Sequence, residues 1–165
     1  MRNRNHIYMT SEGFSFHTIE LKQIYKSKRK YTAAFSHLKN LCDHKEFYPL
    51  KELGDGCFFC GHFSTHGIRL YLTEKEGTDD LYIIKAIINP RKLIDPDCSY
   101  LGIMPSDEKS LDRMEEEFTE IMRQAGLPEF IDEWSLTRID LCVNFVFNRK
   151  KTPPADDPAY RGALT

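Results

Sequence analysis

The chain has 165 residues, a formal net charge of −2, 41% hydrophobic and 29% charged residues. This length suits one domain with a real core and is short for two, and the composition is ordinary for a soluble globular protein. No run approaches the roughly 20 apolar residues of a membrane span, and no global basicity indicates nucleic acid. The start, MRNRNHIYMT, has no apolar leader region, so with five cysteines we expect a cytoplasmic protein with reduced thiols and no membrane partner.

Charge is distributed unevenly along the chain. Residues 1–40 hold eight Lys or Arg against two acids, whereas residues 107–120 hold seven acids against two bases. A basic start and an acidic helix within one small domain predict an oriented surface potential.

The first third of the chain predicts strands followed by a helix. The stretch HIYMTSEGFSFHTIEL is typical of two short strands around a Ser-Glu-Gly turn. Apolar residues at helical spacing predict an amphipathic helix over 31–43, and residues 44–56 are expected to form a loop.

The middle of the chain predicts three strands. CFFCGHFS and IRLYLTE are expected to form a hairpin that turns near His66 and Gly67. LYIIKAIINP predicts a strand that Pro90 ends, and residues 91–105 are expected to be irregular.

The last third predicts a helix and one further strand. Ser106 is the expected N-cap, an apolar stripe runs from Leu111 to Ala125, and Gly126 with Pro128 ends the helix. A strand is expected over about 134–147.

The order β-β-α-β-β-β-α-β predicts an α+β fold. Hairpins and a meander favour a single antiparallel sheet, covered on one face by two helices and open on the other. We expect this domain to span residues 1–148, with a Pro-rich linker or disordered tail over 149–165. The open face is where a function is expected.

The stretch LTRIDLCVNF, residues 136–145, carries polar residues where a buried strand would carry aliphatic ones. By alternation, Thr137, Ile139, Leu141, Val143 and Phe145 are expected to face the helices. The opposite face is expected to carry a mixed set: Arg138, Asp140, Cys142 and Asn144.

Two oxygen donors on that face suggest a hard-metal site. Asp140 and Asn144 suit Mg²⁺ or Mn²⁺, and Arg138 beside them can hold a phosphate or orient the carboxylate. They lie roughly 13 Å apart along a strand, so each would need ligands from neighbouring strands. The alternative is a structural Arg138–Asp140 pair on a solvated sheet face.

The motif TRIDLCVNF resembles the R-[IL]-D-x-x-x-[DN]-[FD] strand of the replication initiation factor family. That family comprises rolling-circle plasmid initiators and relaxases of integrative mobile elements. GIRLYLTEKEG, YIIKAIINPRKLI and the helix before the strand follow the order of the first half of such proteins, over about residues 60–147.

The resemblance implies DNA nicking by a tyrosine that becomes linked to the 5′ end, assisted by a metal bound to acidic residues. The first acidic position of the motif falls on Asp140, and the second falls on Asn144, a neutral amide. The family's tyrosine lies downstream of this strand, so we expect the chain to be an N-terminal half. Its activity as an enzyme is expected only together with a downstream catalytic half.

A zinc site is the rival prediction. Two thiolates in Cys57-x-x-Cys60-Gly resemble one zinc knuckle, which further thiol and imidazole ligands would complete. The candidate zinc ligands are Cys42, His44, Cys57, Cys60 and His62. The alternative is that these cysteines are buried thiols on a strand.

The stretch IYKSKRKY places basic residues between two tyrosines. Lys26, Lys28, Arg29 and Lys30 suit phosphates, while flanking rings suit bases of single-stranded nucleic acid. The alternative is a solvated segment before a helix whose Tyr31 packs inward.

Together these patterns predict a DNA-binding N-terminal half of a replication initiator or relaxase-like protein. Its partner would be single-stranded or hairpin DNA, and its sheet face would contribute a metal or phosphate site to nicking. A zinc-stabilised, non-enzymatic binding module is the alternative.

Overall fold

A computed structural model describes residues 8–43, 50–75, 81–98 and 103–148, with the backbone alone described for 8–14 and 143–148. In chain order the elements are β1 (Tyr8–Tyr25), α1 (Lys28–Asp43), β2 (Leu50–Gly54), β3 (Cys57–Cys60), η1 (Ser64–His66), β4 (Ile68–Lys75), β5 (Leu81–Ile88), α2 (Pro90–Ile94), α3 (Glu108–Ala125), η2 (Ile131–Glu133) and β6 (Ser135–Asn148). The strands form one antiparallel sheet in the order β2-β3-β4-β5-β1-β6.

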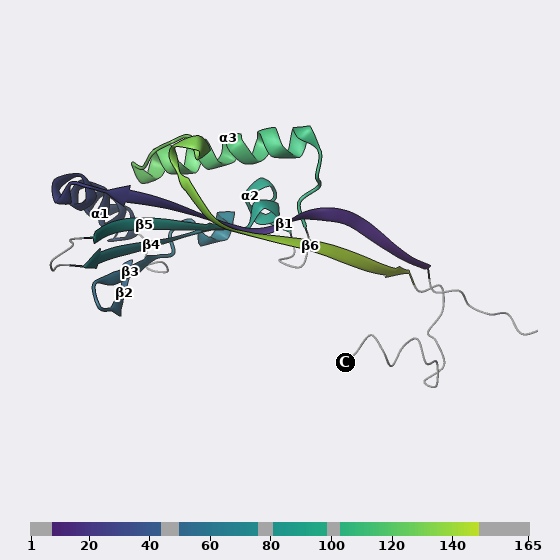
Figure 1. The fold of residues 1–165 in the computed structure, drawn as a ribbon, viewed down its shortest axis with the longest axis horizontal. Helices are drawn as coiled ribbons and strands as arrows, with labels where there is room; N and C mark the ends of the chain where they lie inside the picture. Colours follow the sequence, from purple (N-terminus) through teal and green to yellow (C-terminus); the bar gives the residue numbers. More distant parts are fainter. Residues whose placement is uncertain (1–7, 44–49, 76–80, 99–102, 149–165) are drawn as a thin grey trace, which may run out of the picture.

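The helices lie on one side of the sheet (Figure 1), which confirms the predicted α+β fold with an open second face. Strict alternation on β4 and β5 explains the division: Leu70, Leu72 and Ile84 are fully buried, whereas the residues between them are partly or wholly exposed. Burial of one face in this way fixes the register, because a shift by one residue would expose the whole apolar set.

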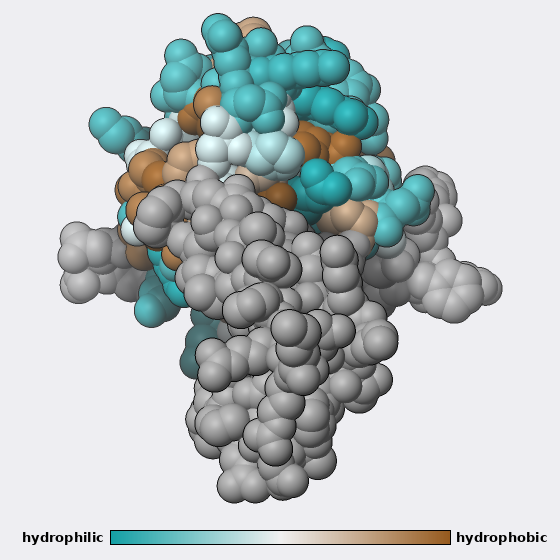
Figure 2. All heavy atoms as spheres, turned by 90° about the vertical axis from the view of Figure 1, so that its right-hand side faces the viewer, coloured by the Kyte–Doolittle hydropathy of each residue, from teal (hydrophilic) through white to brown (hydrophobic). Residues whose placement is uncertain are grey.

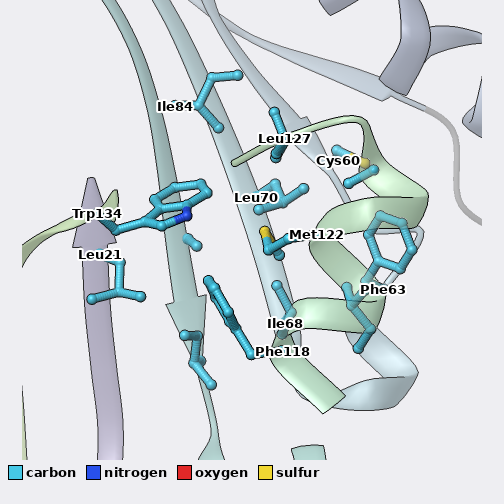
Figure 3. Close-up of a cluster of buried hydrophobic side chains, with 14 of the residues drawn as sticks. Leu21, Cys60, Phe63, Ile68, Leu70, Ile84, Phe118, Met122, Leu127 and Trp134 are labelled. Atoms are coloured by element: carbon cyan, nitrogen blue, oxygen red, sulfur yellow. The ribbon is translucent and has the colours of Figure 1, made fainter. Parts of the chain in front are cut away.

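Helix α3 is the longest of the helices that cover the sheet (Figure 3), and α1 and α2 cover it beside α3. The apolar stripe of α3 places Phe118 and Met122 over the sheet, and the Phe118 ring meets Trp134 edge-on with 6.0 Å between centroids. Hydrophilic side chains cover its outer surface at the top of Figure 2, with hydrophobic ones gathered directly below. The buried layer is therefore apolar, as the spacing of these residues predicts.

The ends of α3 have identifiable caps. Asp107, not the predicted Ser106, is the N-cap, and its Oδ1 accepts a hydrogen bond from the backbone N–H of Ser110 at 2.9 Å. Gly126 ends the helix as predicted, with φ +66°. A Cβ there would lie 2.8 Å from Cδ2 of His37 on α1, so glycine also allows the two helices to approach.

Strand β1 corrects the prediction of two short strands around a Ser-Glu-Gly turn. The chain runs without a turn from Tyr8 to Tyr25, because β6 pairs along nearly its whole length and a bulge between Ser11 and Phe14 absorbs the extra residues. Beyond the other strands, β1 and β6 continue as a long two-stranded ribbon (Figure 1).

Strand β6 lies at the sheet edge, where its helix-facing side is less covered than that of β4 or β5. Ile139 lies opposite the buried Ile19, on the side that faces the helices as predicted, yet it is 41% exposed; Leu141 is 67% exposed, and Thr137 is exposed too. The helix layer does not extend over this edge. Val143 and Phe145 belong to the part of β6 whose side chains are not described.

Four short elements were not predicted: β2, α2 and the 3-10 helices η1 and η2. Residues 50–54 form β2 within the expected loop, pairing with β3. Residues 90–94 form α2, mostly within the stretch 91–105 expected to be irregular; Asn89 is its N-cap and accepts a hydrogen bond from the backbone N–H of Lys92, and Pro90 takes the first helical position. Helix α1 begins at Lys28, three residues before the expected start. Within the described residues, no helix is long and apolar enough to cross a bilayer.

We expect Phe118→Ala to lower the free energy of unfolding by about 3–5 kcal/mol, because it removes a fully buried ring and leaves a cavity against Trp134. Leu111→Ala, on the same helix but 38% exposed, is the matched control and should cost under about 1 kcal/mol. Chemical denaturation followed by Trp134 fluorescence measures both. Equal losses would contradict the assignment of α3's inner face.

Candidate nucleic-acid interface

The sheet face opposite the helices, here called the open face, is basic. Residues paired directly across antiparallel strands share a face, so the register assigns each strand residue to one side. Its cations among the described strands are Lys22, Lys51, Arg69, Lys75, Lys85 and Arg138, and its carboxylates are Glu20 and Asp140. Helix α3 on the other side carries six acids and three bases. The acidity is confined to α3, because α1 beside it in the helix layer carries four bases and one acid, and of the described bases in residues 1–40 the register places only Lys22 on the open face.

One cross-strand row on this face combines bases with rings. Register places five residues side by side across β1, β5, β4, β3 and β2: Lys22, Lys85, Tyr71, Phe59 and Lys51. We call this set the basic–aromatic row. Adjacent strands lie about 4.8 Å apart, so the row spans roughly 19 Å.

The centre of the row is aromatic. The rings of Phe59 and Tyr71 lie with centroids 5.2 Å apart and planes tilted by 43°, and both side chains are only partly buried. Partly exposed rings on an open sheet face are available to stack on planar ligands such as bases.

Lysines flank the rings on both sides. Lys51 is exposed, Lys22 is partly exposed, and neither has an ion-pair partner among the described residues. Lys22 also lies directly opposite Lys85, and like charges in that position destabilise a sheet. The arrangement is unfavourable in the free protein and suits an anionic partner.

Glu20 partly offsets this repulsion. Its Oε1 lies 3.0 Å from Nζ of Lys85 and accepts a 2.9 Å hydrogen bond from the Thr137 hydroxyl. Burial raises the pKa of Glu20, but the hydrogen bonds from Lys85 and Thr137 and the charges of Lys85 and Arg138 outweigh it and hold the pKa below its usual value. Glu20 is therefore ionised and ties β1, β5 and β6 together.

Arg138 and Asp140 lie on the open face, as their spacing predicted. Nε of Arg138 donates to Oδ1 of Asp140 at 2.7 Å, which raises the pKa of the guanidinium. They pair with Glu20 and Thr18 of β1. Asn144 is placed on β6 through its backbone, but its side chain lies outside the described part.

The basic stretch before α1 is only partly available to phosphates. Lys28 pairs with Glu74 at 3.1 Å, while Lys26, Arg29 and Lys30 are exposed. Tyr31 is buried against the ring of Tyr82, 5.4 Å between centroids. The inward-packing alternative therefore holds for this tyrosine.

The predicted zinc ligands are not brought together. Cys57 pairs with Thr73 on the open face, whereas Cys60 pairs with Leu70 on the buried face, so the two thiols of the C-x-x-C lie on opposite sides of β3. His44 lies outside the described residues. In the described segments, no three His, Cys, Asp or Glu side chains are grouped to hold a metal ion.

Cys42 and Cys60 instead meet inside the core. Their sulfurs lie 3.4 Å apart, and both side chains are buried. Burial, together with the neighbouring Cys60, raises the pKa of Cys42 to about 12, and burial raises that of Cys60 as well. Both are therefore neutral thiols that pack as apolar groups.

Several interface residues were missed by reasoning from the sequence. Lys22, Lys51, Tyr71 and Lys85 stand on four different strands, and only the inter-strand register brings them into one row. A signal did exist within β4, where Arg69, Tyr71 and Thr73 alternate with buried aliphatic residues.

Comparison with known proteins adds no relative. No family model matches the sequence, and neither curated proteins nor solved structures give a significant match. The resemblance to replication initiation factors stays a prediction from the sequence motifs over residues 60–147.

We expect Glu20→Gln to lower the free energy of unfolding by about 0.5–1 kcal/mol at pH 7, because Lys22 and Lys85 then face each other without a carboxylate. Folding lowers the pKa of Glu20 from its usual value of 4.5. The difference in unfolding free energy between the variant and the original protein should therefore be constant above pH 4.5 and disappear as the pH falls through the pKa of Glu20 in the folded protein. Urea denaturation at stepped pH measures it. Glu52→Gln, on exposed β2, is the control; an effect of Glu20→Gln that persists at pH 2 would contradict this account.

Proposed function

We propose that this chain binds single-stranded DNA across its open face, as the DNA-binding N-terminal half of a replication initiator or relaxase-like protein of a mobile element. The basic–aromatic row carries the proposal. Stacking on rings is sequence-tolerant because every base has a flat face, and lysines beside the rings follow the phosphate backbone. The open face supplies both groups within one row.

The direction of the charge supports the same partner. A strand of DNA is attracted to the open face and repelled by the acidic outer surface of α3, which favours binding on the open face. Lys26, Arg29 and Lys30 lie exposed around the start of α1 and add phosphate contacts beyond the row. The TRIDLCVNF motif favours DNA over RNA within this proposal.

The Arg138–Asp140 pair is our candidate for the residues that take part in the cleavage step of the proposed nickase. In the intact protein, Asp140 would join the ligands of Mg²⁺ or Mn²⁺, which stabilises charge on a scissile phosphate, and Arg138 would hold that phosphate or orient the carboxylate. Asn144, roughly 13 Å further along the strand, would need ligands from a neighbouring strand to hold an ion of its own.

Tyr71→Leu tests the role of the row. We expect it to weaken binding of a fluorescein-labelled oligothymidine by about 5- to 150-fold, the usual range for loss of one stacked base, while keeping apolar contact with Phe59. Fluorescence anisotropy measures the change. Phe130→Leu, an exposed ring outside the open face, is the control and should leave the affinity unchanged.

The lysines are tested in the same assay across a salt series. The double substitution Lys22→Gln and Lys51→Gln should make the slope of log K against log salt shallower by about 0.7 for each phosphate of a single strand that is no longer neutralised. Lys39→Gln, on the exposed side of α1, should leave the slope unchanged. Absence of binding at low salt would refute DNA recognition by this chain.

Asp140→Ala tests the nickase part. In the intact protein, we expect the rate of hairpin cleavage with Mg²⁺ or Mn²⁺ to fall by about a hundredfold or more, because the substitution removes a metal ligand. Asp140 is exposed enough at the sheet edge that circular dichroism should show an unchanged fold. Retained cleavage would remove Asp140 from the mechanism.

A further inference from the structure

A pocket of about 270 Å³ opens where β5 ends. Strand β1 continues past this point, but β5 gives way to α2, so a space remains between β1 and the start of β4. Its lining comes from β1, η1, β4, β5 and the N-cap of α2, and includes His17, Thr18, Ser64, Arg69, Ile87 and Asn89. Thr18, Arg69 and Ile87 belong to the open face by register, so the pocket lies at one end of that face.

The pocket is lined by hydrogen-bond donors. Arg69 is exposed and has no ion-pair partner in the described segments. Asn89 uses Oδ1 to accept the Lys92 backbone N–H at 3.0 Å, which leaves its amide N–H groups as donors. The hydroxyl of Ser64 is buried without a partner among the described residues.

His17 and Thr18 add one more donor. Nδ1 of His17 lies 3.0 Å from Oγ1 of Thr18. If the hydroxyl donates to the ring, Nε2–H is left for a ligand; if the ring donates, the hydroxyl is left. The pair therefore keeps one donor whichever way the proton lies.

The lining favours an anion over a cation. Among the described residues no carboxylate lines the pocket, and Arg69 provides the planar fork that matches phosphate oxygens. Its volume lies just below the roughly 300 Å³ at which pockets hold drug-sized ligands, so it suits one small anionic group.

We propose that this pocket binds the terminal phosphate of a DNA strand lying on the open face; the inference rests on the proposed function. A terminal phosphate presents three acceptor oxygens and nearly two charges, which matches donors from Arg69, Asn89 and the His17–Thr18 pair. Arg69 is two residues from Tyr71 on β4, about 7 Å along the strand. A nucleotide stacked on Tyr71 thus has its end group beside the pocket.

The test compares a short oligothymidine carrying a 5′-phosphate, a 3′-phosphate or neither, by fluorescence anisotropy with an internal label. We expect one of the two phosphates to increase affinity about tenfold, the order expected of charge-assisted hydrogen bonds to Arg69. Arg69→Gln and Thr18→Val should each reduce this ratio, Arg69→Gln to about one.

Lys51→Gln is the matched control on the same face. It lies four strands from β1, away from the pocket, so it should lower the affinity for all three oligonucleotides while keeping the tenfold ratio. Equal affinity for the three oligonucleotides, or a ratio that survives Arg69→Gln, would overturn the pocket assignment and leave the proposed function standing. Failure of all three to bind would overturn the proposed function, and this inference with it.

Discussion

Burial of one sheet face beneath α3 is the constraint on which the rest of the molecule depends. Successive residues of a strand point to opposite sides, so burying Leu70, Leu72 and Ile84 compels Arg69, Tyr71 and Lys85 to face outward. The core and the candidate interface are consequences of the same register. A substitution that shifted that register would lose both together.

The parts of the fold that follow from local pattern were predictable from the sequence. Strands β4 and β5 alternate between buried and more exposed residues over most of their length, and α3 carries buried residues at helical spacing from Met114 to Ala125. Strand β1 was divided wrongly because Glu12 and Gly13 suggest a turn, whereas in the fold they fall at a bulge in a continuous pairing. The alternation of apolar and polar residues in β6 was visible in the sequence, but the pattern within one strand does not show whether the helix layer extends over that strand.

The candidate interface was less predictable than the fold for a related reason. Arg138 and Asp140 are neighbours in one strand, so their shared face could be derived from spacing alone. The basic–aromatic row and the pocket depend on which strand lies beside which, and that order is set by contacts between distant segments. The C-x-x-C spacing suggested a zinc site that the fold does not form, because residues three apart in an extended strand point to opposite faces.

The place of β1 between β5 and β6 also has a consequence for how the chain folds. Tyr8 pairs with Asn148, and about 110 residues separate the end of β1 from the start of β6. At the usual rate of protein synthesis, the ribosome needs on the order of 5–20 s to make these residues. During that time β1 can pair with β5 but keeps its other edge exposed. Contacts of such long range slow folding, and an unpaired edge invites association with other chains. The nascent protein should therefore depend most on protection from aggregation while β6 is still being made.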